Sequence, residues 1–448
     1  MQAYKSFARR FAADNLHRLF CAKIATGTAV GLDKKTPMRF NRNLSDEISL
    51  IRRKVSAGCY AFTPYRLILS SKGRGKAPRE FNVATVRDRL ALAALAELLD
   101  DVYDTVSATP HPQSLVGDAL EAVNSGRFSH CLKADLAGFY PSIPHDKLLT
   151  LLNRKIRKPE IRALIKSAIT TPNTLMGTKA KSGRTAGVPE GLAISNRLAN
   201  IYAGQLDAVF AKRKDIRYMR YVDDILIFYD ARVSPDIQAI LEREVGNLGL
   251  ELNGDKTSPY DLGCDKFQFL GYEFEPGGGL SVRASTVRHL EQTIERELGK
   301  MRGKTGQQLK SAVRHLNTRI TGCRITEDGI RFQRYGWLHY YSRINDVSLL
   351  CKLDLLVAKL VNRYGLGIQG DLKSFKKTYY QMRYKASTTK YIPTYDMGCT
   401  VEEKRKDLEF LFPQEGWSAR ADEEIERLYS RRIRALASRL EKDVGTVS

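Results

Sequence analysis

The sequence predicts an α+β fold with an antiparallel sheet. Residues 216–230 read IRYMRYVDDILIFYD, in which two adjacent acids separate two apolar, β-rich runs, and this is the pattern of a β-hairpin. A short apolar run within 130–143 and the sequence KFQFLGYEF at 266–274 predict two more strands. Beyond residue 281 the sequence is mostly helical in pattern and basic in composition. The predicted strands therefore lie in the middle of the chain, and helices follow them.

The predicted helices are recognised by apolar residues at intervals of three and four. This periodicity predicts helices at 86–99, 145–168 and 190–212. Another helix is predicted to begin with Ser234 as its N-cap and to end at Gly249. The apolar faces of these helices are expected to be buried.

Charge and cysteine content restrict the class of protein. The 448 residues include 73 Lys and Arg against 50 Asp and Glu, which gives a formal net charge of +23 and predicts a polyanionic partner. No apolar run is long enough to cross a bilayer, and no secretory signal is expected. The seven cysteines form no CxxC pair, which argues against a disulfide framework or a cysteine-based zinc site. We therefore expect reduced thiols, a cytoplasmic location and no membrane partner.

Three aspartates give the strongest signal for chemistry. Asp135 ends the first predicted strand, and Asp223 and Asp224 form the tip of the predicted hairpin. Two divalent metal ions about 4 Å apart require carboxylates that converge from different strands. A solvated turn is the ordinary explanation for one aspartate at a strand end. It does not explain Tyr-x-Asp-Asp inside an apolar hairpin together with a third acid far upstream.

An ordered series of motifs within residues 65–275 resembles the reverse transcriptases, especially the prokaryotic branch of group II intron, retron and phage-defence enzymes. The motifs are, in chain order, YRLILSSKGRGKAPR, VRDRLALAAL, LKADLAGFYPSI, GVPEGLAISNRLANIY, RYVDDILIF, LGLELNGDKT and FQFLGYEF. RFQRYGWLHYYSRI at 331–344 is more loosely similar to the thumb region of the intron-type enzymes. The resemblance implies a right-hand polymerase with fingers, an antiparallel-sheet palm and a helical, basic thumb.

The resemblance also implies a division of the chain. The expected parts are an N-terminal basic extension at 1–60, fingers at 61–130, a palm at 131–275 with a fingers insertion at 145–187, a thumb at 276–370 and a basic helical C-terminal extension at 371–448.

The same resemblance assigns the catalytic residues. Asp135, Asp223 and Asp224, with the backbone of Leu136, are expected to hold two Mg²⁺ ions, and Mn²⁺ is an alternative metal. Lys256 in NGDKT matches a lysine that protonates the leaving pyrophosphate. A surface lysine explains Lys256 equally well.

Four residues are expected to contact the incoming nucleotide. Lys72 and Arg79 match residues that grip the triphosphate, although a solvated basic loop is the alternative. Tyr140 falls where the family has a steric gate against the 2′-hydroxyl of a ribonucleotide, and a core tyrosine is the alternative. Glu190 and Asn196 depart from the family pattern, which has Gln and Pro at these positions. The departure makes the usual amide contact to the sugar uncertain.

Two further segments are expected to contact nucleic acid. Phe269, Leu270 and Gly271 match the primer grip, where glycine allows close backbone approach. Residues 372–395 combine basic and aromatic side chains without an acid, which favours contact with a nucleic-acid strand. An amphipathic helix packed on the thumb is the alternative. The basic residues selected in this segment are Lys376, Lys377, Arg383 and Lys385.

The resemblance implies RNA-templated DNA synthesis from deoxynucleoside triphosphates. No endonuclease domain is recognisable after the thumb, and the nucleotide loop is altered. Both observations favour a bacterial anti-phage defence enzyme that copies a dedicated non-coding RNA into DNA. Two alternatives stay open, a non-enzymatic RNA-binding intron maturase and a template-independent DNA polymerase of the same fold. No motif identifies the template RNA, the primer or the oligomeric state.

Overall fold

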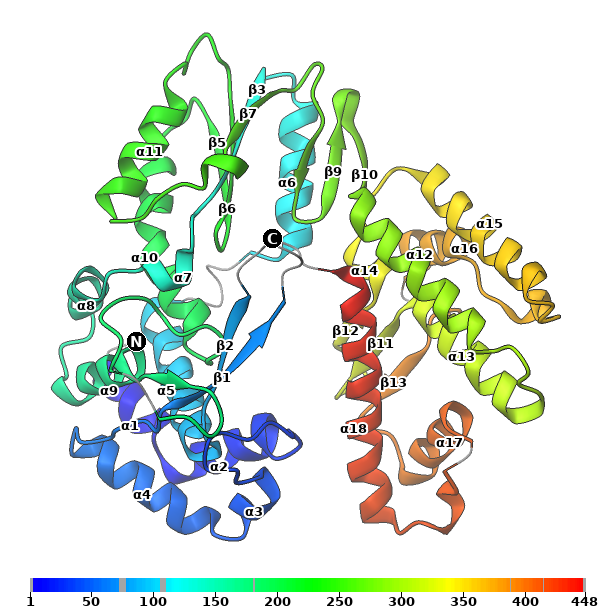
Figure 1. Cartoon of the computed structure of the whole chain (residues 1–448), viewed down its shortest axis with the longest axis horizontal. Helices are drawn as coiled ribbons and strands as arrows, with labels where there is room; N and C mark the ends of the chain where they lie inside the picture. Colours follow the sequence, from blue (N-terminus) through cyan, green and yellow to red (C-terminus); the bar gives the residue numbers. More distant parts are fainter. Residues whose placement is uncertain are drawn as a thin grey trace. The chain divides into compact units, whose positions relative to one another are not determined.

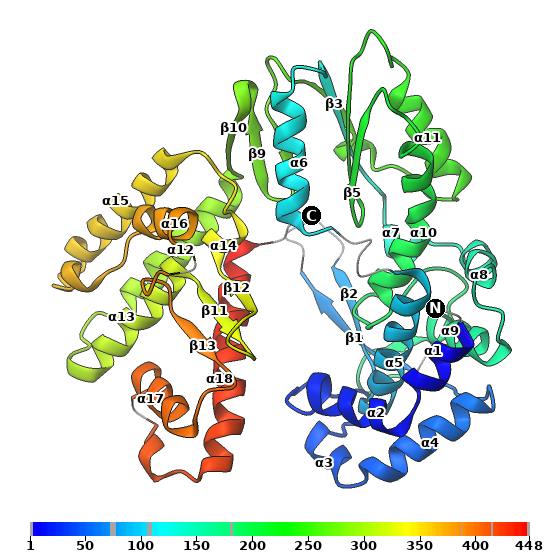
Figure 2. The ribbon, with the colours of Figure 1, turned by 180° about the vertical axis from the view of Figure 1, so that it is seen from behind.

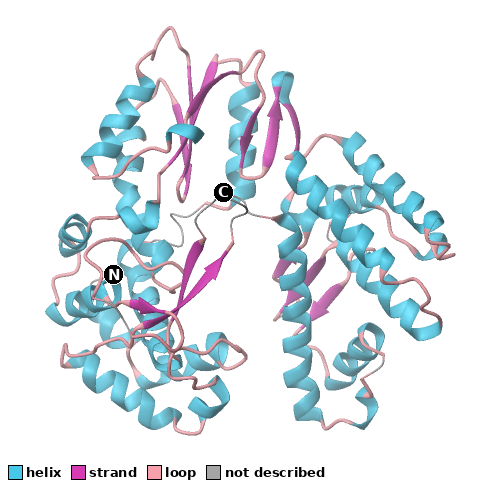
Figure 3. Cartoon of the chain, in the orientation of Figure 1, coloured by secondary structure: helices cyan, strands magenta, loops and turns pink. Residues whose placement is uncertain are grey.

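The computed structural model describes residues 3–71, 78–104, 110–179, 182–386, 388–413 and 415–445. The chain forms two compact units, each built from helices and strands (Figures 1, 2 and 3). Unit 1 comprises Met1–Pro110 and Phe128–Pro259, and unit 2 comprises His111–Arg127 and Tyr260–Ser448.

The central sheet of unit 1 contains the predicted hairpin. Its strand order is β5-β6-β3-β7, and both β5 and β3 pair with β6 in the antiparallel direction. These pairings confirm the predicted α+β class with an antiparallel sheet. The strands are β3 (His130–Asp135), β5 (Arg217–Tyr221), β6 (Asp224–Tyr229) and β7 (Ser258–Asp261).

The interior strand β6 is buried along its whole length. Its near-continuous apolar sequence is the kind that a strand covered on both faces requires. Ile225 and Ile227 share one hydrophobic core with Leu198 and Tyr202 of α10 and with Leu241 of α11. Figures 1 and 2 both show α11 beside the β5–β6 hairpin. This packing fixes the end of β6 at which Asp224 lies. The two helices are α10 (Ser195–Phe210) and α11 (Ile237–Asn247).

A second region of unit 1 surrounds the buried helix α5. The side chain of Thr85 accepts a hydrogen bond from the backbone N–H of Asp88 and so caps the helix, and Tyr60 donates to the buried carboxylate of Asp88 at 2.8 Å. The helix predicted at 86–99 is confirmed and continues to Tyr103. The elements of this region are α1 (Ala3–Arg10), α2 (Ala13–Leu19), α3 (Pro37–Asn41), α4 (Leu44–Ser56), α5 (Val86–Tyr103), β1 (Tyr65–Ser70), β2 (Arg79–Val83) and β4 (Asn173–Thr174).

The single helix predicted at 145–168 was wrong. The structure has two helices there, α8 (His145–Asn153) and α9 (Pro159–Thr170). Pro159 has no N–H to donate within a continuous helix, and it is tolerated only in the first turn. The proline therefore begins a second helix.

Two other predicted helices begin later than expected. α10 starts at Ser195 rather than five residues earlier, because Gly191 has a φ of +93° that no helix allows. α11 starts at Ile237 rather than next to Ser234, because the Ser234 hydroxyl donates to the carboxylate of Asp215 instead of capping the helix. A glycine turn thus delays the start of α10, and a side-chain hydrogen bond to a residue 19 positions earlier occupies the expected N-cap of α11.

The first sheet of unit 2 replaces the single strand predicted at 266–274 with a tight hairpin. Leu270 and Gly271 form its turn with φ angles of +50° and +80°. A Cβ atom on Gly271 would lie 2.6 Å from the hydroxyl of Tyr341, so glycine is required by its neighbour as well as by its backbone angle. The strands are β8 (Phe267–Phe269), β9 (Tyr272–Glu275) and β10 (Gly279–Val282).

The rest of unit 2 is mostly helical, as predicted. A second small sheet, in the order β12-β11-β13, was not predicted. None of the described helices of the chain is long and apolar enough to span a membrane. The strands are β11 (Cys323–Thr326), β12 (Phe332–Tyr335) and β13 (Thr394–Asp396). The helices are α6 (Pro112–Asn124), α12 (Ala284–Gly299), α13 (Gly306–Thr321), α14 (Trp337–Tyr340), α15 (Val347–Arg363), α16 (Phe375–Tyr384), α17 (Val401–Leu411) and α18 (Asp422–Glu441).

Candidate active site

The three predicted aspartates lie at the same end of the central sheet. Asp135, the last residue of β3, lies directly opposite Asp224, the first residue of β6. Both are buried, with exposed fractions of 4% and 6%. Asp223 lies in the turn between β5 and β6, and its carbonyl accepts a hydrogen bond from the N–H of Leu136 at 3.2 Å.

The turn that carries Asp223 is strained. Val222, the residue before it, has a φ of +59°. A β-branched residue rarely adopts this angle, and such outliers cost roughly 1–3 kcal/mol and gather at functional sites. The buried strand β6 supplies the packing that holds the turn in this conformation. The strain therefore supports a functional role for the tip of the hairpin.

Burial and like charge act on these carboxylates together. Burial, and then the neighbouring carboxylate of Asp223, raise the pKa of Asp224 to about 7. Burial and the carboxylate of Asp135 also raise the pKa of Asp223. Lys133 opposes the shift of Asp224 only in part. The site therefore concentrates negative charge that a cation would stabilise.

One cation of the chain already contacts this site. The ammonium of Lys256, in the short 3-10 turn Gly254–Lys256, lies 3.0 Å from Asp135 Oδ1. The backbone N–H of Asn253 donates to the carbonyl of Asp135 at 2.7 Å, and its side-chain amide lies 3.4 Å from Asp135 Oδ2. Lys256 is half exposed, with 53% of its side chain accessible. Lys256 is thus part of the candidate site. The alternative was a surface lysine without a partner, and the contact with Asp135 does not fit that alternative.

The donors present fit Mg²⁺ or Mn²⁺ chemically, but they do not form a finished metal site. Hard carboxylate oxygens are the ligands that these ions prefer. Leu136 has a buried side chain, so only its backbone carbonyl is suited to the predicted role. Across the described part of the chain, no three carboxylate, imidazole or thiolate side chains converge closely enough to hold a metal ion. In this structure the ammonium group of Lys256 balances the charge of Asp135.

The two departures from the family pattern are both held by hydrogen bonds. Glu190 accepts a hydrogen bond from Arg79 Nε at 2.7 Å, and its backbone carbonyl accepts from the N–H of Asn82 at 2.8 Å. Asn196 accepts a hydrogen bond from the hydroxyl of Tyr140 at 2.7 Å. Arg79 therefore supplies the positive charge that the carboxylate of Glu190 needs. Lys72, which was predicted to bind the triphosphate together with Arg79, lies outside the described residues.

Tyr140 lies close to the acidic groups. It is in the short helix α7 (Phe139–Ser142) and is 8% exposed. Burial raises the pKa of its hydroxyl, and the charges of Asp223 and Glu190 raise it further. The ring is therefore part of the core and also feels the charges of the site. The interpretations of Tyr140 as a steric gate and as a core tyrosine do not exclude each other.

The other predicted contact residues lie in unit 2. Phe269 and Leu270 have buried side chains, and the carbonyl of Leu270 accepts a hydrogen bond from the hydroxyl of Tyr340 at 3.1 Å. Contact of this turn with a primer stays a prediction. On α16, the residues Lys376, Lys377 and Arg383, followed by Lys385, are exposed.

Sequence reasoning did not single out two residues that the structure places at the site. Asn253 holds both the backbone and the side chain of Asp135, and Lys133 on β3 lowers the pKa of Asp224. Asn253 stands three residues before Lys256 in LELNGDKT, so the motif carried the signal. Lys133 is two residues before Asp135 and therefore points to the same face of the strand.

An antiparallel sheet with carboxylates at a strand end and at a hairpin tip is consistent with the right-hand polymerase fold that the sequence predicts. Residues 72–274 match the family described as reverse transcriptase (RNA-dependent DNA polymerase). This part of the chain, which is less than half of its length, is therefore similar to the reverse transcriptase domain.

Relatives of this domain occur in intron-encoded proteins. The chain is 32% identical over 169 residues to an uncharacterized 91 kDa protein in a cob intron of Schizosaccharomyces pombe, over 36% of this chain and 20% of that protein. It is 27% identical over 168 residues to the group II intron-encoded protein LtrA of Lactococcus lactis subsp. cremoris, over 36% of this chain and 28% of that protein. The chain thus matches less than a third of the length of either relative.

A solved structure of telomerase from Candida albicans, in complex with a TWJ fragment of telomeric RNA, is also similar. It shares 12% sequence identity with this chain at a TM-score of 0.45, over 92% of this chain and 69% of that one.

Proposed function

We propose that this protein is an RNA-directed DNA polymerase that uses two divalent metal ions. The observation that carries the proposal is the register of β3 and β6, which sets Asp135 opposite Asp224 with Asp223 in the adjoining turn. This pair of strands lies inside the region that matches the reverse transcriptases. Carboxylates from two strands are what in-line phosphoryl transfer with two metals requires.

Each residue of the site has a task in the proposed reaction. The metal ions, when bound, would activate the primer 3′-hydroxyl and neutralise charge on the triphosphate. Asp135, Asp223 and Asp224, with the carbonyl of Leu136, would hold them. Lys256 would give a proton to the leaving pyrophosphate, and its 3.0 Å contact with Asp135 supports this role.

Basic and aromatic side chains would bind the incoming nucleotide. Arg79 and Lys72 would contact the triphosphate, and Tyr140 would exclude a 2′-hydroxyl. The ion pair between Arg79 and Glu190 supports a Glu190 whose charge is compensated beside the nucleotide.

We further propose that the template is a dedicated non-coding RNA, that the product is DNA, and that the protein serves bacterial anti-phage defence in the cytoplasm. The net charge of +23 supports a nucleic-acid partner. A template-independent polymerase of the same fold would make DNA that copies no RNA, and a non-enzymatic intron maturase would bind RNA and make no DNA.

One experiment separates these functions. The protein is purified with its bound RNA and supplied with labelled dNTPs and Mg²⁺, with and without prior RNase digestion, and the products are sequenced. A DNA copy of one recurrent RNA, lost after RNase, supports the proposal. DNA of unrelated sequence that survives RNase indicates template-independent synthesis, and RNA binding without any DNA product indicates a maturase.

Glu190→Gln tests the nucleotide loop. The change is nearly isosteric and removes the charge that holds Arg79. We therefore expect a folded, active enzyme whose KM for dNTP falls severalfold, because Arg79 no longer has to leave an ion pair to bind the triphosphate. Steady-state incorporation of a single nucleotide measures KM, and RNA binding is expected to be unchanged.

Glu80→Gln is the matched control for this prediction. Glu80 is an exposed acid on β2, next to Arg79 in the sequence, and 56% of its side chain is accessible. This variant should leave KM for dNTP unchanged. If Glu190→Gln also changes neither KM nor kcat, Glu190 does not face the nucleotide.

Helix α16 is proposed to contact the RNA. Tyr380 and Tyr384 are exposed on this helix and stack on each other with ring centres 5.8 Å apart. Lys376 and Lys377 are exposed on the same helix. Exposed aromatic rings beside basic groups are the combination that binds single strands.

Replacing the four selected basic residues with Gln should weaken RNA binding. Each lost phosphate contact is expected to lower the slope of log K against log salt by about 0.7. Equilibrium binding to a single-stranded RNA at several salt concentrations measures this slope. An unchanged slope would indicate that this helix faces solvent and does not contact RNA. The residues to replace are Lys376, Lys377, Arg383 and Lys385.

The control for this experiment removes the same number of charges from exposed positions elsewhere in unit 2. Its slope should stay within error of the wild-type value, because loss of net charge alone acts weakly at a distance in salt. The control residues are Lys352, Lys359, Lys406 and Arg427.

A further inference from the structure

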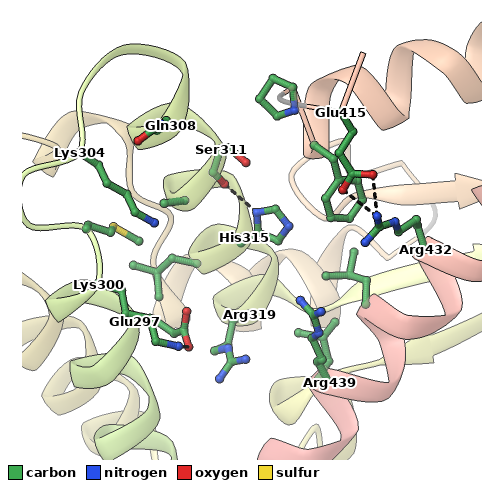
Figure 4. Close-up of a pocket in the computed structure, with 17 residues that line it drawn as sticks. Glu297, Lys300, Lys304, Gln308, Ser311, His315, Arg319, Glu415, Arg432 and Arg439 are labelled. Carbon is green, nitrogen blue, oxygen red and sulfur yellow. Dashed lines mark hydrogen bonds and ion pairs between the residues drawn. The ribbon is translucent and has the colours of Figure 1, made fainter. Parts of the chain in front are cut away.

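Unit 2 contains a cavity that the proposed polymerase chemistry does not use. Its volume is about 770 Å³, and it is lined by residues of α12, α13 and α18, of the loop between α12 and α13, and of the segment after α17 (Figure 4). This volume is within the usual range of small-molecule sites. None of the residues predicted for catalysis, nucleotide binding or primer contact lines it. The cavity is therefore a candidate for a second site.

The lining of this cavity is strongly basic. Five cationic side chains line it against two carboxylates. An anion is the complement that such a lining favours. The basic residues are Lys300, Lys304, Arg319, Arg432 and Arg439, and the acids are Glu297 and Glu415.

The acids nearby are already neutralised by three of these basic groups. Each of these three acids has its own partner at 3.1 Å or less, so none of the three is left to neutralise the remaining cations. Among the residues that the structure describes, Lys304 and Arg439 have no hydrogen-bond or ion-pair partner for their side chains. The three ion pairs are Glu297 with Lys300, Glu415 with Arg432, and Asp443 with Arg319.

Two arginines and one histidine line the cavity from the helices α13 and α18. Figure 4 shows Arg319 of α13 and Arg439 of α18 on facing sides of the cavity, with His315 above them. Burial is the main cause of the lowered pKa of His315; the hydrogen bond with Ser311 and the charge of Glu297 oppose this shift, and the charges of Arg439 and Arg319 add to it. Its Nδ1 lies 2.8 Å from the carbonyl of Ser311. Arg319 is already paired with Asp443, so Arg439 is the guanidinium of this group that a bound anion would stabilise.

Part of the cavity wall is apolar. Met301, Leu316, Leu436 and Leu440 line it with buried side chains. Phe412, which is half buried, adds an aromatic ring to this wall. A ligand that fills the cavity would therefore have an apolar or aromatic part as well as a negative charge.

We propose that this cavity binds a nucleoside phosphate. The phosphate groups would lie between Arg319, Arg439 and Lys304, and the base would lie against the apolar wall that includes Phe412. A free nucleotide and the phosphorylated end of a nucleic-acid strand offer the same chemistry. The proposal goes beyond polymerase activity and does not depend on it.

The test uses the full chain under conditions that disable the polymerase site. Asp223→Asn with Asp224→Asn is combined with EDTA, and the wild-type protein in EDTA is measured in parallel in case the substitutions affect folding. ATP binding is measured by calorimetry at physiological salt, and inorganic tripolyphosphate is the comparison probe. We expect ATP to bind at least tenfold more tightly than tripolyphosphate, because only ATP has a base that can contact the apolar wall of the cavity.

Lys304→Gln combined with Arg439→Gln should weaken ATP binding by about tenfold or more, since charge-assisted contacts to phosphate are lost. Both side chains are exposed at the mouth of the cavity, so the fold should be kept. Arg431→Gln, an exposed arginine of α18 outside the cavity, is the matched control and should bind ATP as before.

A pair of RNA oligonucleotides identifies the source of the ligand. If an RNA with a 5′-triphosphate binds more tightly than the same RNA with a 5′-hydroxyl, and the cavity variant removes the difference, the ligand is a strand end. If ATP alone responds to the variant, the ligand is a free nucleotide. Equal binding of ATP and tripolyphosphate would overturn the nucleoside assignment. If neither probe binds, or if the cavity variant behaves like Arg431→Gln, the site itself is overturned.

Discussion

Asp223→Ala combined with Asp224→Ala is expected to abolish DNA synthesis by more than roughly 10³-fold while leaving a folded protein that binds RNA. The two substitutions remove the carboxylates from the hairpin tip but leave the apolar residues of β6, which form the core, intact. Primer extension on an RNA template with saturating dNTP and Mg²⁺ measures the loss. Residual synthesis within tenfold of the wild type would contradict the assignment.

Thermal stability is the control for this prediction. The pKa of Asp224 determines whether loss of its carboxylate raises or lowers the free energy of unfolding. Burial raises this pKa to about 7, well above its ordinary value near 3.9. Between these two values the folded state binds more protons than the unfolded state, so the free energy of unfolding falls as pH rises through this range. In EDTA at pH 8, the double variant should therefore melt at the same temperature as the wild type or higher.

A second control distinguishes loss of the site from loss of charge. Asp255→Ala removes an exposed acid from the turn that carries Lys256. This variant should keep most of its DNA synthesis. A large loss in Asp255→Ala would show that acids near the site act through general charge rather than through the three aspartates.

Tyr140→Val is expected to reduce discrimination between dNTP and rNTP by roughly 10²-fold. The ring of Tyr140 is buried beside Asp223 and Glu190, and its removal would open the space that a 2′-hydroxyl needs. The ratio of kcat/KM for the two nucleotides in single-nucleotide incorporation measures the effect. If the ratio stays the same, Tyr140 is only a core residue.

Tyr140→Phe is the matched control. It keeps the ring and removes only the hydroxyl that donates to Asn196 at 2.7 Å. Discrimination should be retained, while the free energy of unfolding falls by about 1 kcal/mol because the amide of Asn196 loses its partner. Together the two variants separate the space occupied by the ring from the hydrogen bond made by the hydroxyl.

The strand part of the site could be predicted because its signal is local. Two apolar runs around Asp223 and Asp224 specify a hairpin, and the run before Asp135 specifies a strand end. The break of the helix at Pro159 was also visible in principle, since a proline inside a helical pattern indicates a boundary. Periodicity outweighed that single residue in the prediction.

Other features depend on contacts between distant parts of the chain, and no local pattern encodes them. β13 pairs in parallel with β11, although about 70 residues separate them. Gly271 matches a primer-grip glycine by motif, but the structure shows that the neighbour it accommodates is the hydroxyl of Tyr341. The basic cavity combines residues of four segments, each of which alone has the composition of an ordinary amphipathic helix or loop.

The contacts of Asp135 have a consequence for how the protein acquires activity during synthesis. Asp135 meets Lys256 across a sequence separation of 121 residues and Asn253 across 118. Contacts of this range form late, because the entropy of closing a long loop opposes them until the intervening core has formed. A chain still emerging from the ribosome therefore has Asp135 but no counter-ion for it and no opposing strand. The chemistry of the site becomes available only when unit 1 is complete.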